Sequence, residues 1–173
     1  MTVYDTIKAR GSIRRYKPDP IPENVLNTIL DAARLAQSAA NRQPWEFIVI
    51  TERGRKQALV SAAGQQRFVG EAAAVVVCLA NPNESVAVGS FNGFLMDLGI
   101  AIENMALTAW DMGVGSCWIG AYNEAAVRSL FGIPDSLRVV SMLTLGYPAE
   151  KPSPKVRKAL SEILHREKYD DRR

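Results

Sequence analysis

The stretch FLMDLGIAIENMALTAW, residues 94–110, is the most apolar long segment of the chain. It predicts one long helix with apolar residues nearly all round its surface. Such a helix is buried on several sides, either inside the fold or against a second subunit. Asp97, Glu103 and Asn104 interrupt the apolar run, which is therefore too short and too polar to span a membrane.

Shorter helices and strands are predicted on both sides of this segment. The strand at residues 73–81 is apolar on both faces, which is typical of a strand in the middle of a sheet. Helices and strands alternate only loosely, which predicts one α+β or α/β domain over residues 1–173 with a mixed sheet. The predicted helices cover residues 2–9, 21–37, 53–64, about 89–111 and 124–132, and the predicted strands cover 46–51, 73–81 and 137–147, with a short strand within 113–122.

The composition argues against several classes of protein. Of the 173 residues, 47% are apolar and 23% are charged, which is ordinary for a soluble globular protein. A net charge of +3 is far from the dense cationic surface of a nucleic-acid-binding protein, and we expect no nucleic-acid partner. Cys78, Cys117 and the single histidine supply neither a disulfide framework nor an ordinary zinc site. The N-terminal residues show no signal-peptide pattern, so we expect a cytoplasmic protein.

The segment RGSIRRYKPDP, residues 10–20, is rich in arginine and stiffened by proline. In an extended chain Arg10, Ser12, Arg14 and Tyr16 point to one side, because strand side chains alternate. Two guanidinium groups and a hydroxyl on one face are suited to an anion, with phosphate the natural candidate. A solvated basic turn is the alternative interpretation.

The loop SAANRQPW, residues 38–45, carries side-chain amides that suit the imide-like edge of a heterocycle, although an ordinary polar loop has the same composition. Other nucleotide motifs fail. GVGSCW, residues 113–118, begins G-x-G but follows a helix and has Trp118 at the third glycine position, so a Rossmann fingerprint is excluded. The P-loop spacing from Gly115 to Gly120 lacks its lysine.

Several short motifs follow one another in a fixed order along the chain. Taken together they resemble the nitroreductase family of FMN-dependent oxidoreductases, over almost the whole chain from Arg10 to about Tyr169. The resemblance implies an α+β fold with a mostly antiparallel sheet between helices. The motifs are RGSIRRY (10–16), ANRQPWEF (40–47), the long helix, GVGSCWIGAYNEAAV (113–127), LTLGYPAEKP (143–152) and RKALSEILH (157–165).

The resemblance also assigns cofactor contacts to positions in this chain. Arg10 and Ser12 match residues that hold the phosphate and ribityl chain of FMN. Arg14 matches a basic residue near the N1 and O2 edge of the flavin, and Gln65 one that reaches its pyrimidine edge. The remaining matches are Ser38, Ala40, Asn41 and Gln43 in a loop given by the opposite subunit, Ile119, Gly120 and Ala121 against the isoalloxazine face and N5, and Arg157 with Lys158 at the phosphate.

The family assembles as intertwined homodimers with FMN at the subunit interface. This implies that the second apolar face of the long helix meets the partner. The charged, proline-segmented tail at residues 151–173 has no compact pattern of its own, and the resemblance implies that it crosses to the partner and adds an edge strand there. The chain departs from the family at Ala39 and Ala40, where many members have Ser or Thr, and in a minimal lid over the flavin.

The functional hypothesis is a ping-pong flavoenzyme that takes hydride from NADH or NADPH and reduces a small acceptor such as a nitroaromatic, a quinone or a conjugated enone. No side chain is required as the catalytic acid, because solvent supplies the proton. Three alternatives stay open: another flavin reaction on the same scaffold, such as dehalogenation, a non-catalytic flavin carrier, and a small RNA-binding domain.

Overall fold

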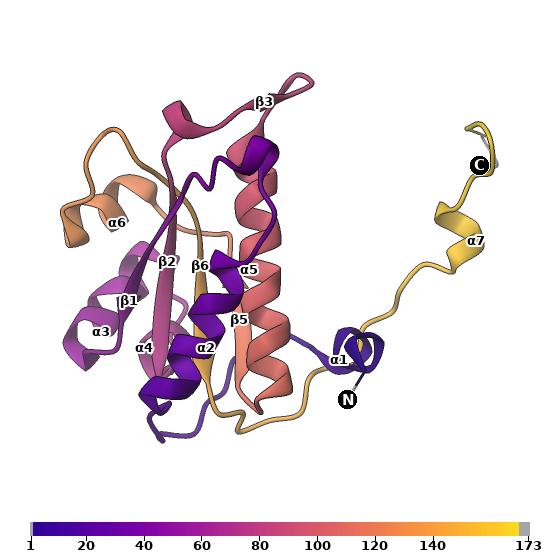
Figure 1. The fold of residues 1–173 in the computed structure, drawn as a ribbon. Coiled ribbons are helices and arrows are strands. Elements are labelled where there is room, and N and C mark those ends of the chain that lie inside the picture. The colour runs from indigo at the N-terminus through magenta and orange to yellow at the C-terminus, as the bar shows by residue number, and fades with distance from the viewer. Residues whose placement is uncertain (1, 170–173) are drawn as a thin grey trace.

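A four-stranded sheet forms the centre of the computed structural model, which describes residues 2–169 (Figure 1). Every strand pair in this sheet is antiparallel, which confirms the expected antiparallel character. A single parallel bridge joins Ser12 to Ser116 at its edge. The strands lie in the order β1 (Trp45–Ile50), β2 (Ala74–Ala80), β6 (Arg138–Gly146) and β5 (Gly115–Ile119).

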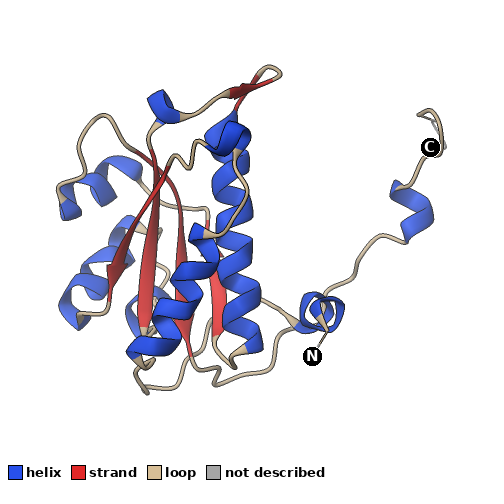
Figure 2. Ribbon diagram, viewed as in Figure 1, coloured by secondary structure: helices blue, strands red, loops and turns tan. Residues whose placement is uncertain are grey.

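Helices cover both faces of the sheet (Figure 2). Val76 and Cys78 of β2 face one helical layer, and Val75 and Val77 face the other, so all of β2 is buried as predicted. The first layer holds α2 (Glu23–Arg34) and α5 (Gly93–Asp111), and the second holds α3 (Arg53–Ala62), α4 (Phe68–Glu71) and α6 (Glu124–Phe131). Outside the layers lie α1 (Val3–Ala9), η1 (Ala39–Asn41), η2 (Pro82–Glu84), β3 (Ala87–Val88), β4 (Phe91–Asn92) and α7 (Leu160–Ile163).

The predicted start of the long helix was wrong by four residues. Gly89 does not begin α5 but lies in the turn of the β3–β4 hairpin, where its φ of 59° suits glycine. The helix begins at Gly93, and a Cβ there would lie 2.0 Å from the carbonyl oxygen of Val86. The hairpin therefore closes tightly on the first turn of α5, and only glycine fits at that contact.

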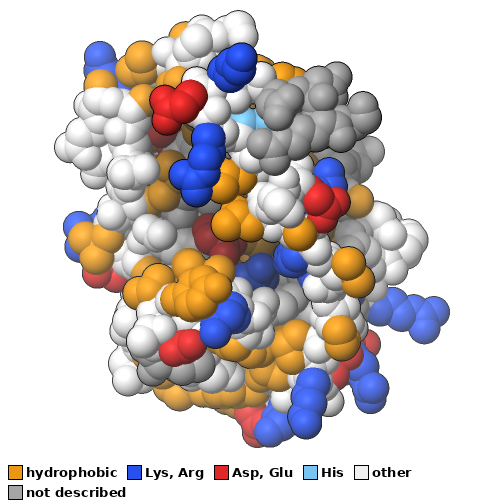
Figure 3. Space-filling view, turned by 90° about the vertical axis from the view of Figure 1, so that its right-hand side faces the viewer, with side chains coloured by type: hydrophobic (Ala, Val, Ile, Leu, Met, Phe, Trp, Pro, Cys, Tyr) orange, Lys and Arg blue, Asp and Glu red, His pale blue; other side chains and the backbone are white. Residues whose placement is uncertain are grey.

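One side of α5 belongs to the core and another is exposed. Leu98 and Ile102 are fully buried against the sheet, whereas Leu95 and Met96 are each about half exposed. Tyr4 on the neighbouring helix α1 is also exposed. Figure 3 shows this side of the molecule, where apolar side chains lie at the surface among basic ones. Within residues 2–169, no helix is both long and apolar enough to cross a membrane.

The C-terminal tail leaves the sheet and extends away from it to α7 (Figure 1). It is fixed at its start, because Pro152 lies so close to Gly11 that a Cβ there would come within 2.4 Å of the proline ring. Further along, the side chain of Val156 is almost fully exposed, and Leu160 is largely so. The partner that the tail is expected to cross to stays a prediction, and residues 170–173 lie outside the described part.

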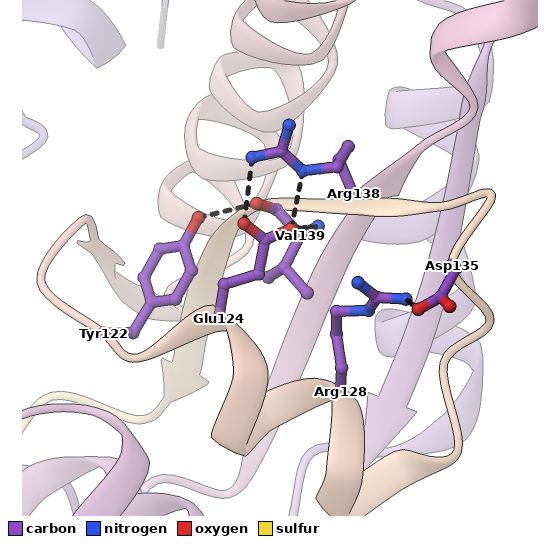
Figure 4. A network of polar contacts seen from close by, with 6 residues as sticks. All are labelled: Tyr122, Glu124, Arg128, Asp135, Arg138 and Val139. Carbon is purple, nitrogen blue, oxygen red and sulfur yellow. Dashed lines mark hydrogen bonds and ion pairs between the residues drawn. The ribbon is translucent and has the colours of Figure 1, made fainter.

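Glu124 holds the start of α6 against β6. Arg138 donates to both of its carboxylate oxygens, through Nε at 2.8 Å and Nη2 at 2.9 Å, and the Val139 amide donates at 3.1 Å. The Tyr122 hydroxyl donates to the Val139 carbonyl at 2.7 Å, so both residues flanking Asn123 are tied to one point of β6 (Figure 4). These bonds fix the segment that leaves β5. The Arg138 guanidinium, opposed in part by burial, lowers the pKa of Glu124 from its ordinary value.

The substitution Glu124→Gln should lower the free energy of unfolding by about 1 kcal/mol at pH 7, since it removes charged hydrogen bonds from a partly exposed pair. Because the folded-state pKa of Glu124 is depressed, its contribution is complete above the ordinary value of about 4.5 and is lost as pH falls through the folded value. Urea unfolding at pH 7 and at pH 3 measures this. The difference between wild type and variant should shrink at the lower pH.

The matched control is Asp135→Asn, which removes a carboxylate that pairs with Arg128 of α6 but is itself fully exposed (Figure 4). It should have the smaller effect at pH 7, because exposed ion pairs contribute little. Equal losses from the two variants, or a Glu124→Gln difference that does not change with pH, would contradict the role assigned to Glu124.

Candidate functional site

Two distant parts of the chain, the arginine-rich segment and the C-terminal tail, converge beside β5. The bridge between Ser12 and Ser116 holds the arginine-rich segment along this strand. Lys155, from the tail, places its Nζ 3.5 Å from the Ser12 hydroxyl oxygen. Arg10 and Arg14 flank Ser12 in the sequence, two residues away on either side. We call Arg10, Ser12, Arg14 and Lys155 the cationic cluster.

The charges of this cluster affect the pKa of the buried Cys117 thiol. Burial raises the pKa of Cys117, and four smaller effects act the other way: the charge of Arg14, a hydrogen bond with Ser12, and the charges of Lys155 and Arg10. Three cations therefore act on one buried atom of β5. This arrangement agrees with the predicted alternation of the segment and produces a local positive potential suited to an anion.

Tyr16, the fourth residue of the predicted alternation, has a structural role instead. Its hydroxyl donates to the Ile13 carbonyl at 2.6 Å and lies 2.7 Å from the Thr144 hydroxyl. Burial is the main cause of the rise in the pKa of Tyr16, so the hydroxyl stays protonated at neutral pH. The same face of the segment therefore carries the groups of the cationic cluster at one end and a core residue at the other.

The cationic cluster borders a cleft of about 590 Å³ between the end of α1 and the tail. Arg10 and Gly11 line one side, and Lys155 and Arg157 line the other. Lys158, predicted alongside Arg157, is not among the lining residues. Lys155 was missed by the sequence prediction, although its spacing of two from Arg157 would place both on one side of an extended chain.

A larger cleft of about 880 Å³ lies elsewhere, beside α2 and α3. Its buried cation, Lys56, already donates to the carbonyls of Ala72 at 2.5 Å and Ala73 at 3.0 Å, which joins α3 to the segment before β2. None of the predicted cofactor residues lines this cleft. The smaller cleft is therefore the better candidate, since several cations meet there.

The far end of β5 leaves its backbone open. A Cβ built at Gly120 would meet nothing within 4 Å, so a flat group has access to the main chain. Ile119 is buried and its carbonyl accepts from the Ser141 hydroxyl at 3.1 Å, which fixes the strand end. From Ser116 to Gly120 is about 13 Å at the rise of a strand. The edge of β5 thus offers an anion site and an open backbone to one elongated ligand.

Two further residues that were predicted to contact the cofactor are Arg14 and Gln65. The Arg14 guanidinium lies 5.8 Å from the ring centroid of Phe68, at the start of α4. Gln65 has a left-handed backbone, with φ of 61°, in the turn before α4. Its neighbour Gln66 donates to the Ala121 carbonyl at 3.2 Å, so this turn lies beside the end of β5. The family resemblance assigned a cofactor contact to Gln65, but nothing in the sequence indicated the contact that Gln66 makes.

The loop at residues 38–43, which we call the η1 loop, has an unusual backbone. Ala40, Asn41 and Gln43 all have positive φ, at 50°, 54° and 53°. Such conformations are costly for non-glycine residues and persist only where the surroundings hold them, often at functional sites. Within the loop, the Gln43 amide donates to the Ser38 hydroxyl at 2.9 Å. No local pattern of residues indicates this strain.

The η1 loop and the cationic cluster attach to α5 at different points. The Ala39 amide donates to Asp97 at 3.0 Å, while Arg10 pairs with Glu103 at 3.4 Å. These two positions are about 9 Å apart along the helix axis. Among residues 2–169, no hydrogen bond or ion pair joins the loop to the cluster, so one subunit does not bring the two groups together by direct contact.

Comparison with known proteins agrees with this geometry. The model of the Nitroreductase family matches residues 7–78 and 56–147 of the chain. Over 158 residues, the chain is 35% identical to a protein of Methanothermobacter thermautotrophicus named a putative NADH dehydrogenase/NAD(P)H nitroreductase, covering 88% of this chain and 80% of that protein.

Solved structures share the fold. The crystal structure of a nitroreductase family protein from Clostridium novyi NT superposes with a TM-score of 0.83 at 35% identity, covering 87% of each chain. The NADPH:FMN oxidoreductase of Vibrio harveyi, solved with NAD⁺, gives a TM-score of 0.87 at 28% identity over 98% of this chain and 78% of its own. Sequence and fold agree, and the chain belongs to the Nitroreductase family of oxidoreductases.

Proposed function

We propose that this chain is a single-domain, FMN-dependent NAD(P)H oxidoreductase that acts as a homodimer. One observation carries the proposal: Arg10, Lys155 and Arg157 line one cleft, with Lys155 3.5 Å from Ser12 at one end of β5, about 13 Å from the open backbone at Gly120. FMN has the matching shape, a phosphate at one end and a flat ring at the other. The relatives support the cofactor class, since the Vibrio harveyi structure is of an NADPH:FMN oxidoreductase.

The residues beside β5 suit the parts of FMN in order. Arg10, Lys155 and Arg157 bind the phosphate as cations that line the cleft, and Ser12 donates its hydroxyl there. Arg14 lies next along the chain, where its charge favours the reduced, anionic form of the ring. Residues 119–121 lie against the ring face through their backbone. The η1 loop contributes from the opposite subunit.

FMN supplies the redox chemistry when it is bound, by accepting hydride from NADH or NADPH and passing it to the second substrate. The chain's own contribution is to bind and orient. Because a Cβ at Gly120 would meet nothing within 4 Å, bound FMN would stay accessible at this point to donor and acceptor in turn. This favours a ping-pong order and a loose choice of small acceptors, such as nitroaromatics or quinones. Solvent supplies the proton.

The exposed apolar surface supports a homodimer. Leu95 and Met96 of α5, Tyr4 of α1 and Val156 of the tail are half exposed or more in the single chain. Burying a fully exposed apolar side chain contributes about 1.5–3 kcal/mol, and burying the rest of a half-exposed one contributes about half of that. A second copy of the chain covers this face in the proposed assembly, with the tail crossing to it.

The purified protein should carry FMN, show a flavin absorption band, and lose that band within seconds when NADH or NADPH is added without oxygen. A quinone added afterwards should restore the band, and stopped-flow absorption should give parallel double-reciprocal plots for donor and acceptor. A protein that binds FMN but is not bleached by either nucleotide is a flavin carrier. A protein that takes up no FMN overturns the proposal.

The substitutions Arg10→Ala and Lys155→Ala should each weaken FMN binding by about 1.5–3 kcal/mol, or roughly 10- to 150-fold, because each removes charge-assisted hydrogen bonds to the phosphate. Titration of the flavin-free protein with FMN, followed by fluorescence, measures the dissociation constant. Lys158→Ala is the matched control, since Lys158 is a tail cation outside the cleft. Similar losses from Lys155→Ala and Lys158→Ala would point to general charge rather than to the cleft.

A further inference from the structure

Asp97 is a buried carboxylate, and one of its two oxygens has no hydrogen-bond partner among the described residues. It lies in the second turn of α5 with only 3% of its surface exposed. Its Oδ1 accepts from the Ala39 amide at 3.0 Å, and its Oδ2 is buried without a hydrogen-bond partner among residues 2–169. A buried oxygen without a donor costs free energy. An apolar residue at this place in the core would avoid that cost, so the carboxylate has another role.

The group that Asp97 binds is the strained loop. Ala39 directly precedes Ala40 and Asn41, both left-handed, and Gln43 follows with the same sign of φ. The hydrogen bonds inside the loop, such as the one from the Gln43 backbone amide to the Ser38 hydroxyl, close the turn without attaching it to another element. The bond from Ala39 to Asp97 attaches this turn to α5. Loss of the acceptor would leave a partly buried amide unpaired and free the left-handed residues to relax.

We propose that Asp97 is a positioning residue, which fixes the η1 loop in its strained form and thereby sets how tightly the cofactor of the opposite subunit is held. The inference rests on the proposed function, in which this loop contacts the partner's FMN. It adds a residue that touches neither the cofactor nor the substrate. Because Asp97 lies on the helix that carries the exposed apolar face, the loop is also fixed relative to the subunit interface.

A purely structural role for Asp97 is the competing explanation, and the chain offers a matched control. Asn104 lies on the same helix, and its Nδ2 donates to the Ala32 carbonyl of α2 at 3.2 Å. It therefore joins α5 to another element by one hydrogen bond, as Asp97 does, but away from the loop. Asn104→Leu should lower the melting temperature and leave the dissociation constant of FMN unchanged within about twofold.

The first test compares Asp97→Leu with Asp97→Asn in the full-length dimer. Leucine removes the acceptor for Ala39 and, like Asn104→Leu, puts a larger apolar side chain on α5, and FMN should bind at least about tenfold more weakly. Asparagine keeps an oxygen that accepts from Ala39, so it should restore binding to within about threefold of wild type. If Asp97→Leu does not fold, Asp97→Ala makes the same comparison.

The second test uses mixed dimers, isolated with two affinity tags, of one Arg10→Ala subunit and one Asp97→Leu subunit. If the loop acts across the interface, one site contains both defects and the other contains neither. One tightly bound FMN per dimer should therefore return, although each homodimer binds weakly. A structural defect confined to its own subunit would leave one defect in each site, and no tight site would form.

The outcomes separate the two proposals. A wild-type protein that takes up no FMN overturns the proposed function. A wild-type protein that binds FMN, with Asp97→Leu binding equally well, overturns the role of Asp97 and leaves the function intact. Failure of Asp97→Asn to restore binding, or failure of the mixed dimer to recover one site, also counts against positioning through the loop.

Discussion

The structure depends on the burial of α5. This helix packs against the sheet through residues such as Leu98 and Ile102, and it also makes both polar contacts that organise the candidate site. Glu103 pairs with Arg10 of the cationic cluster, and Asp97 accepts from Ala39 of the η1 loop. The two contacts lie about 9 Å apart on a rigid rod. A displacement of α5 would therefore move both groups together. A second copy of the chain packed on the exposed face of α5 would have a fixed position relative to both groups.

The cationic cluster is unfavourable until an anion enters. Lys155 lies 3.5 Å from Ser12, and Arg10 and Arg14 are each two residues from Ser12 in the chain, so like charges are brought together there. Among residues 2–169, the ion pair that relieves this is the one between Arg10 and Glu103, and 44% of the Glu103 side chain is exposed. A phosphate with two negative charges neutralises the cluster more fully than one half-exposed carboxylate.

Periodicity in the sequence predicted most of the fold. The strand at 73–81 is central because it is apolar on both faces, and the alternation of Arg10, Ser12 and Arg14 places them beside one another in the structure. Tyr16 also lies an even number of residues from Arg10, yet its side chain belongs to the core. Alternation predicts on which side of an extended segment a side chain lies, but not which part of the protein packs against that side. Lys155 depends on a tail that returns to residue 11, and no local pattern encodes that contact.

Tertiary contacts decide the features that periodicity did not reveal. Asp97 looked like an interruption of an apolar run, yet it is among the most buried polar residues, because the amide it binds comes from a loop 58 positions earlier in the chain. The left-handed backbone of Ala40 likewise has no signature in its own residue type, since alanine rarely adopts it. A strained loop and a half-satisfied buried carboxylate each raise the free energy of the folded chain. Both features occur at the contact between Ala39 and Asp97. This favours the interpretation that the contact was selected because it positions the loop, and not because it stabilises the fold.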